Sequence, residues 1–416
     1  MAPTPMLFSP MRDSSLTSHP ICVFVGTWSF VFLLYALHLS EQLIYHISDF
    51  YYVCLAITVP FLVAYWYVNR LLTLVARMPP SSAPGPSAQL ATLEPHSAEL
   101  IWRHTVRLLQ IWGVITVIEI IFSGGLPIIW LITGSSKNYR DFGIPSLHGF
   151  LISILLACSM VSFWMFLETR QRRYIAVPVF ALLWFAASIT RGYMLGLLLQ
   201  LLFFTLARKP LTTGQIVKIA VGFVCFIIAF GYLGDFRSGG GDLIRALGKP
   251  TERYPDWLPT GFLWAYIYLA TPLNNLLNTL QLNPSIDQFT LAATTSQLLP
   301  SFVRNLIFPE SLVTQGDLVD TSLNVSTSFA PPYLDMGLLG IVLYSLLFGS
   351  VAALFWHFRR ERFYLLGYSF VAQALALSVF FSFLLALPYL FQLVWFRYLL
   401  RPGAARRPAP RRTATA

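Results

Sequence analysis

Long apolar runs alternate with short polar clusters along the chain, and this pattern defines its predicted elements. A membrane-spanning helix needs about 20 mostly apolar residues, and by this criterion the sequence predicts ten helices. They cover Ile21–His38, Tyr51–Val68, Trp102–Phe122, Ser146–Leu167, Tyr174–Thr190, Gly192–Leu206, Ile216–Leu233, Met336–His357, Phe363–Ala386 and Pro388–Leu400. One kinked helix is the alternative for the last two, because only Pro388 separates them. The pattern predicts an all-α polytopic membrane protein.

Three stretches do not fit the spanning pattern. Met78–Ala98 and Arg401–Ala416 have low complexity and little apolar content, so both are predicted to be disordered. The block between Leu233 and Met336 has no clear span, and connections of that length are usually functional. The predicted organisation is a terminal segment 1–20, seven helices in 21–233 with the linker 78–98, a large external loop 234–335 with interfacial helices, three helices in 336–400 and a basic tail 401–416.

Composition agrees with a membrane protein. The 416 residues are 56% apolar and 11% charged, and their mean hydropathy is +0.64, whereas a soluble domain carries about 25% charged residues. The apolar runs lack the roughly ten-residue alternation of an outer-membrane barrel. All four cysteines lie inside apolar runs without metal-site spacing. No small-residue cleavage site follows the first apolar run, so the first helix is expected to remain as a signal anchor.

The net charge of +10 is distributed unevenly. With ten spans and a cytoplasmic N-terminus, the cytoplasmic side receives 20 of the 28 basic residues but only five of the 18 acidic ones. This asymmetry follows the positive-inside rule. It predicts that both termini are cytoplasmic and that the outer face is acidic on balance, and it explains the basic charge without a nucleic-acid partner.

The sequence lacks the motifs of nucleotide-driven chemistry. The stretch GGGDLIRALGKP has the wrong glycine spacing for a phosphate loop and places Pro250 where a hydroxyl residue belongs. There is no DxD pair and no HExxH motif. ATP-driven chemistry and a metal-bound nucleotide sugar are therefore not expected, and no metal site or soluble cofactor is predicted.

Charged residues predicted at the outer face carry the candidate chemistry. Arg191, in the turn of an otherwise apolar hairpin, suits an anionic lipid head group or a pyrophosphate. An arginine that snorkels at a hairpin is an equally good interpretation. The segment GYLGDFRSGGGDLIRALGK joins Arg237 and Arg245 to three glycines whose backbone amides can approach a ligand. A flexible loop with mutually neutralising charges is the simpler interpretation of that segment.

The segment WLPTGFLWAYIYLATPLNNLLNTLQL is aromatic and amphipathic, which predicts an interfacial or re-entrant helix. Asn274, Asn275 and Asn278 recur in it at helical spacing. Aromatic rings beside carboxamides can stack on sugars and hydrogen-bond to them. An aromatic belt at the membrane surface produces the same pattern.

Other candidates lie next to predicted helix ends. Asp335 follows Tyr333 at the start of the eighth helix, where a carboxylate is more often an N-cap than a general base. Glu119 lies near the outer end of the third helix, and His148 at the outer start of the fourth. Intramembrane ionisable groups are functional candidates, although an isolated histidine is more often structural. The residues leave the general base open among Asp335, Glu119, His148 and Asp242.

Five strings occur in the order DFGIPSLHGF, SITRGYMLG, FGYLGDFRSGG, WAYIYLATPLNNL and a final NVSTSF…PYLDMGLLG run that enters a helix. Together they resemble bacterial oligosaccharide repeat-unit polymerases, the O-antigen and exopolysaccharide polymerase family. The resemblance covers roughly Gly125–Gly349. Arg237–Gly248 also has the spacing of an arginine, ten residues and a glycine that is associated with such polymerases.

The resemblance implies a metal-independent, lipid-donor glycosyltransferase with GT-C-like architecture at the outer face of the bacterial inner membrane. Donor and acceptor are then undecaprenyl-pyrophosphate-linked oligosaccharides, with membrane lipid and a chain-length regulator as further partners. Arg191 and Arg237 become the residues that bind the leaving pyrophosphate, and Asp335 is the third catalytic candidate. The candidate substrate-binding residues are Asn274, Tyr333, Arg245, His148 and Glu119.

Two other functions fit the same features. A ligase that moves a finished glycan onto a lipid or protein acceptor shares the donor and much of the architecture. A lipid-linked sugar flippase belongs to a different class, and the sequence shows neither the duplicated halves nor the midplane charges typical of transporters.

Overall fold

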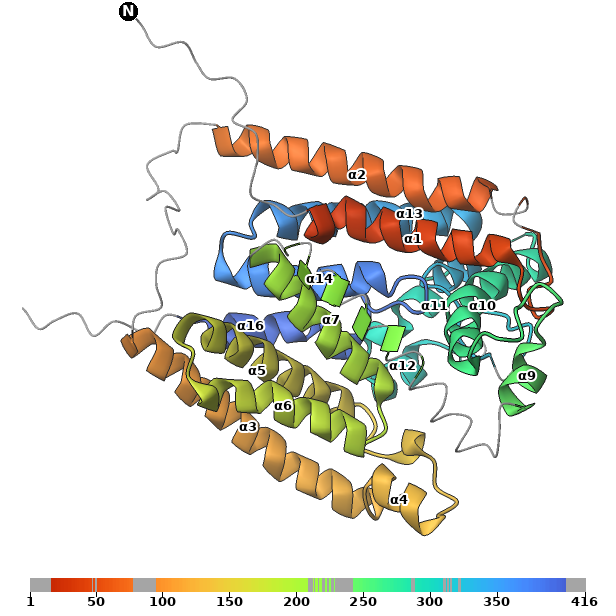
Figure 1. Cartoon of the computed structure of the whole chain (residues 1–416). Coiled ribbons are helices and arrows are strands. Elements are labelled where there is room, and N and C mark those ends of the chain that lie inside the picture. Colours follow the sequence, from red (N-terminus) through yellow and green to blue (C-terminus); the bar gives the residue numbers. More distant parts are fainter. Residues whose placement is uncertain are drawn as a thin grey trace, which may run out of the picture. The chain divides into compact units, whose positions relative to one another are not determined.

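The computed structural model describes residues 16–46, 48, 51–77, 95–208, 242–285, 289–309, 316–320 and 323–401, with isolated positions in 212–228 and 312–314. Over these residues the chain is helical, and the only β-type pairing is an isolated bridge between Ser40 and Pro250 (Figure 1). The chain divides into two compact units. Unit 1 comprises Met1–Gly85, Leu199–Arg360 and Gly367–Ala386, and unit 2 comprises Pro86–Leu198, Glu361–Leu366 and Leu387–Ala416.

Helices long and apolar enough to cross a membrane confirm the prediction of a helical membrane protein. In the described part of the chain there are five such stretches: Pro20–Leu37, Tyr51–Ala76, His96–Thr133, Leu147–Thr169 and Ala330–His357. Tyr174–Thr190 and Gly192–Leu206 match helices outside this set, and Phe363–Ala386 and Pro388–Leu400 overlap shorter ones. Most of Ile216–Leu233 lies outside the described residues. The total of ten spans and the GT-C-like arrangement stay predictions.

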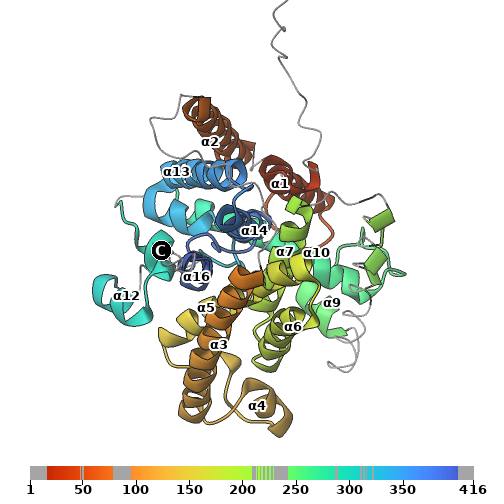
Figure 2. The same cartoon turned by 90° about the vertical axis from the view of Figure 1, so that its left-hand side faces the viewer.

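Unit 1 is built around three helices that lie side by side, α1 (Pro20–Leu37), α2 (Tyr51–Arg77) and α13 (Ala330–His357) (Figures 1 and 2). Aromatic rings fill the space between them, and Phe24 stacks on Phe61 with ring centroids 4.0 Å apart. Gly349 lets α2 and α13 approach closely. Any side chain at this position would clash, since a Cβ there would lie 2.3 Å from the Phe61 carbonyl oxygen. The other elements are η1 (Leu16–Ser18), α9 (Asp242–Gly248), α10 (Thr260–Leu282), α11 (Ala292–Thr295), η4 (Ser296–Leu298) and α12 (Ser301–Ile307).

The predicted helix Met336–His357 is only the second part of α13. The helix starts at Ala330, because its two prolines fit the first turn. It bends at Gly337, which adopts a φ of 62°. The two parts pack closely, since a Cβ at Gly340 would lie 1.8 Å from the Pro332 carbonyl oxygen. The bend therefore requires glycine at both positions.

The segment predicted as an interfacial or re-entrant helix forms α10, one continuous helix that packs against α1, α9 and α13. Its C-terminal half is buried at every residue from Ala270 to Leu280, although Pro272 lies within it. The helical spacing of the asparagines was predicted correctly, but their side chains are buried among protein segments.

Unit 2 is organised around α5 (Leu147–Thr169), which is apolar on all sides and buried from Leu151 to Val161. It packs against α3 (Pro95–Ser123), α6 (Arg172–Ala187), α15 (Leu387–Leu390) and α16 (Gln392–Leu399). The connection from α3 to α5 contains α4 (Pro127–Thr133) and η3 (Tyr139–Asp141). The start of α3 corrects the predicted disordered linker, because Pro95–Ala98 is helical; residues 78–94 lie outside the described part.

α7 (Arg191–Arg208) and α14 (Arg362–Ala376) each run from unit 2 into unit 1. α14 ends ten residues before the predicted Ala386, because Ser378 is held by other segments of unit 1. The Ser378 carbonyl accepts the Ser328 N–H, and its hydroxyl accepts the Trp28 indole N–H, both at 2.9 Å. The alternative of one kinked helix over the last apolar stretch is therefore wrong.

Candidate functional site

A buried carboxylate and a histidine meet at one end of unit 2. α3 supplies Glu119 one turn before its C-terminus, and His148 is the second residue of α5. Glu119 Oε2 lies 3.1 Å from His148 Nδ1, and Glu119 Oε1 accepts the Ile144 backbone N–H at 3.0 Å. The Glu119 side chain is 1% exposed and that of His148 is 23% exposed. The structure thus pairs two residues that were predicted only as separate candidates.

The connection between α3 and α5 is fixed around this pair. Ser123 accepts the Gly143 N–H on its hydroxyl at 2.9 Å and the Lys137 ammonium on its carbonyl at 2.7 Å. Lys137 also lies over the Trp130 ring, 5.4 Å from its centroid. Gly143 adopts a φ of 98°, and a Cβ there would lie 2.7 Å from the His148 ring. Only glycine lets the backbone approach the imidazole this closely.

Arg191 begins α7 at the same end of unit 2, because α6 returns there after α5 runs away from it. The turn before it is a Schellman motif, in which Thr190 N–H reaches the Phe185 carbonyl at 2.9 Å and Ile189 N–H reaches the Ala186 carbonyl at 3.1 Å. Ile189 occupies the left-handed position with a φ of 57°, which is strained for a β-branched residue. Arg191 is exposed and forms no ion pair with another described residue. Within the described part of the chain no carboxylate engages this guanidinium, which can therefore bind an anion.

Asp335 caps a helix, but not its own. Its carboxylate accepts the Thr290 hydroxyl at 2.6 Å and the backbone N–H groups of Ala293 and Thr294 at 3.1 and 2.7 Å. These groups lie at or just before the start of α11, and Asp335 is 1% exposed. The capping interpretation favoured from the sequence therefore holds for α11 instead of α13. Every described contact of the carboxylate stabilises this junction.

Two asparagines of α10 hold the segments around it. Asn274 Oδ1 accepts the Tyr35 hydroxyl at 2.9 Å, and its amide donates to the Gln42 carbonyl at 2.9 Å. Asn275 donates to the Leu323 and Val325 carbonyls at 2.9 and 2.8 Å. Both side chains are 1% exposed. The polar face of α10 thus attaches loops of unit 1 to the helix.

Tyr333 has a similar structural contact. Its hydroxyl donates to the Asn283 carbonyl at 2.6 Å, just beyond the end of α10, and the residue is 6% exposed. Among the candidates from the glycine-rich segment, Arg245 lies on α9, exposed, 3.3 Å from Asp256. Arg237 lies outside the described residues, and nothing is described of the Asp242 side chain.

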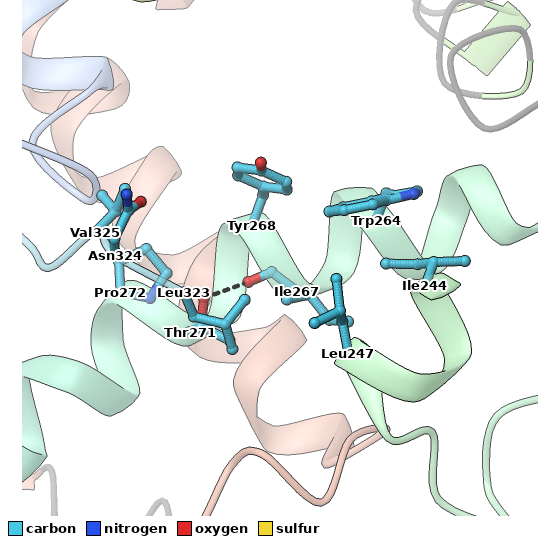
Figure 3. Close-up of a pocket in the computed structure, with 10 residues that line it drawn as sticks. All are labelled: Ile244, Leu247, Trp264, Ile267, Tyr268, Thr271, Pro272, Leu323, Asn324 and Val325. Atoms are coloured by element: carbon cyan, nitrogen blue, oxygen red, sulfur yellow. Dashed lines mark hydrogen bonds between the residues drawn. The ribbon is translucent and has the colours of Figure 1, made fainter. Parts of the chain in front are cut away.

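A small groove lies on unit 1 between α9, α10 and the segment 323–325 (Figure 3). It encloses about 80 Å³. Trp264 and Tyr268 stand on one side of it, with ring centroids 5.6 Å apart and planes tilted by 34°. The exposed Asn324 amide lies at the other end and has no hydrogen bond to a described residue. Ile244, Leu247, Ile267, Thr271, Pro272, Leu323 and Val325 complete the lining.

The aromatic segment that contains Trp264 and Tyr268 was a sugar-binding candidate in the sequence, but Asn324 was not. It lies in the quoted run Asn-Val-Ser-Thr-Ser-Phe, where it follows a leucine like an ordinary loop residue. The position of Asn324 depends on Asn275, whose amide donates to the carbonyls on both sides of Asn324 and so holds this residue at the groove. No local pattern reveals a contact across 48 residues.

The sequence-predicted site residues thus fall into two groups. Glu119, His148 and Arg191 lie at one end of unit 2, whereas Asn274, Tyr333, Asp335 and Arg245 belong to unit 1. Within the described part of the chain, no three His, Cys, Asp or Glu side chains come together in a way that could hold a metal ion. Comparison of the chain with protein-family models, with curated proteins and with solved structures finds no match.

Proposed function

We propose that this chain is a membrane glycosyltransferase that polymerises lipid-linked oligosaccharide repeat units. Donor and acceptor are oligosaccharides on undecaprenyl pyrophosphate, and the reaction takes place at the outer face of the bacterial inner membrane. The observation that carries the proposal is the groove of Trp264, Tyr268 and Asn324, which lies within the segment that resembles repeat-unit polymerases.

The groove has the chemistry of a sugar-binding surface. Aromatic faces pack against the C–H groups of a pyranose ring, and a free carboxamide offers donors and an acceptor to its hydroxyls. The Trp264 and Tyr268 rings lie one helical turn apart on α10, so both can contact the same glycan.

Arg191 supplies the charge that the donor needs. When the glycosidic bond forms, negative charge develops on the leaving pyrophosphate, and a guanidinium stabilises it through two parallel hydrogen bonds. Arg191 is exposed at a helix end and keeps its donors free of carboxylates among the described residues. Arg237 and Arg245 are also proposed to contact the lipid-linked substrate, each on the ground of its own sequence context.

Single substitutions at the arginine and in the groove test the proposal. Arg191→Ala is expected to lower chain elongation by roughly 100-fold, and Arg191→Lys is expected to recover only part of it, because an ammonium cannot form the bidentate contact. Trp264→Ala and Tyr268→Ala are expected to raise the KM for the acceptor. Arg304→Ala and Trp257→Ala are matched controls, since Trp257 is exposed, Arg304 is partly exposed and neither lines the groove.

The products separate this proposal from its alternatives. A ladder of repeat units supports a polymerase, whereas a single glycan conjugate indicates a ligase. Labelled lipid-linked sugar that crosses the bilayer without a new glycosidic bond indicates a flippase. Elongation that is unchanged in Arg191→Ala and in Trp264→Ala would refute the proposed site.

A further inference from the structure

We infer that His148 is the general base of the reaction and that Glu119 is its positioning residue; this inference rests on the proposed function. His148 Nε2 takes the proton from the acceptor sugar hydroxyl as its oxygen bonds to the anomeric carbon of the donor. The bond from that carbon to the phosphate oxygen breaks, and its electron pair leaves with the lipid pyrophosphate. The proton on His148 then passes to water.

The hydrogen bonds of Glu119 determine which imidazole nitrogen is available. An ionised carboxylate only accepts hydrogen bonds, so in the proposed state, with Glu119 ionised, His148 Nδ1 carries the imidazole hydrogen across the 3.1 Å contact to Glu119 Oε2. The Nε2 lone pair is then left to accept a proton. The Ile144 N–H occupies the other Glu119 oxygen at 3.0 Å, which holds the carboxylate in this orientation.

The Nε2 edge of His148 is open. The bonds of this residue to other described residues are its Nδ1 contact and its backbone N–H to the Ile144 carbonyl at 3.0 Å. In the described part of the chain, Nε2 has no hydrogen-bond partner and is not buried. The His148 side chain is 23% exposed. The atom therefore faces solvent, where a substrate hydroxyl can reach it.

The rest of the surroundings hold the ring still. Phe142 meets the imidazole edge to face at 5.4 Å. Gly143 lies against the ring with a φ of 98°, and its N–H is bound by Ser123 at 2.9 Å. A base whose ring is fixed on these sides loses no freedom when the substrate arrives. A carboxylate that is 1% exposed in an apolar helix is also costly to keep, which favours a functional role.

The geometry separates His148 from the other described candidate. Both carboxylate oxygens of Asp335 accept hydrogen bonds from the start of α11, and the residue is 1% exposed. Protonating it would break the junction between α11 and α13. His148 is oriented by a carboxylate and keeps one nitrogen open, whereas both oxygens of Asp335 are already occupied.

Glu119→Gln is the decisive variant. The glutamine carbonyl can still accept the Ile144 N–H, but its amide donates to Nδ1 and moves the imidazole hydrogen to Nε2, which can then no longer act as a base. With purified protein and a synthetic lipid-linked repeat unit, kcat is expected to fall by roughly 100-fold while KM stays within about threefold. Glu99→Gln, on the exposed part of the same helix, is the matched control.

His148→Ala distinguishes proton transfer from packing. Added imidazole is expected to restore its turnover by roughly tenfold or more, because a small base can replace the missing one. His96→Ala, an exposed residue of α3, controls for effects of imidazole on the assay. Size-exclusion profiles of all variants report on folding.

The outcomes separate this inference from the proposed function. If wild-type protein builds no polymer, the proposed function fails. If wild-type protein builds polymer and Glu119→Gln keeps its kcat, or if folded His148→Ala gains nothing from imidazole, only the general-base assignment is overturned. A kcat loss in Glu119→Gln together with imidazole rescue of His148→Ala supports it.

Discussion

At the residue scale, the site candidates that the structure describes differ in what their hydrogen bonds hold together. Asn274, Asn275 and Asp335 spend their hydrogen bonds on neighbouring segments of unit 1. Glu119 also has its oxygens occupied, but one of its partners is a histidine with an open nitrogen. The sequence identified all of these residues as candidates. Only the hydrogen-bond partners seen in the structure separate residues that hold the fold from residues proposed to act in catalysis.

Asp335 is expected to contribute to stability through α11. Asp335→Ala leaves the Thr290 hydroxyl and two backbone N–H groups without their acceptor. A buried donor without a partner costs about 1–3 kcal/mol, so the Tm in detergent should fall clearly. Asp256→Ala, at a side chain that is 95% exposed, is the control. An unchanged Tm in Asp335→Ala would show that the cap is unimportant.

His19 is expected to make unit 1 sensitive to acid. Burial, and then the charge of Arg359, lowers the pKa of His19 below its ordinary value of 6.5. Below that pH the unfolded chain binds a proton that the folded chain resists, so stability is full above pH 6.5 and falls as the pH decreases.

The measurement is thermal unfolding across this pH window. The Tm of wild-type protein should stay constant above about pH 6.5 and fall at lower pH. His19→Gln can keep a hydrogen bond to the Tyr65 hydroxyl, now 3.2 Å from His19 Nε2, and should lose less. Equal losses in the two proteins would exclude His19 as the source of the sensitivity.

At the element scale, the apolar pattern predicted helices well and their breaks poorly. α1, α5 and α6 begin within two residues of their predicted starts, because uninterrupted apolar runs leave little choice of structure. The bend of α13 and the end of α14 depend on contacts from distant segments. Gly337 needs its left-handed φ only because the two parts of α13 pack together, and Ser378 leaves the helix because Trp28 and Ser328 bind it.

The α2–α13 pair offers a test of close helix packing. Gly349→Ala would place a methyl group 2.3 Å from the Phe61 carbonyl oxygen, which forces the helices apart. The expected loss is about 1–3 kcal/mol, measured as a lower Tm in detergent. Gly26→Ala in α1 meets no atom within 4 Å and should be neutral or stabilising. Equal Tm values for the two variants would contradict the close approach.

The turn before Arg191 stores backbone strain. Ile189→Gly removes the cost of a β-branched residue at a φ of 57° and is expected to stabilise the protein by about 1 kcal/mol. If the rigid turn also aims Arg191, elongation should fall although Tm rises. Gly192→Ala, with open space around it, is the control. A lower Tm in Ile189→Gly would show that the turn is not strained.

At the scale of the whole molecule, the sequence predicted a helical membrane protein and several of the candidate site residues, but not their contacts. Glu119 and His148 were found separately, because a contact across 29 residues leaves no trace in local spacing. Gly143, which lies against the His148 ring, is part of the segment DFGIPSLHGF and was not predicted as a site residue. The orientation argued from basic residues stays a prediction of the positive-inside rule.

The central proposal is that this membrane protein polymerises lipid-linked glycans, and one measurement tests it most directly. Purified protein in liposomes is given a synthetic undecaprenyl-pyrophosphate-linked repeat unit, and the products are resolved by chain length. The account predicts a ladder of repeat units for the wild type and almost none for Arg191→Ala. A donor that remains unextended in the presence of folded wild-type protein would contradict it.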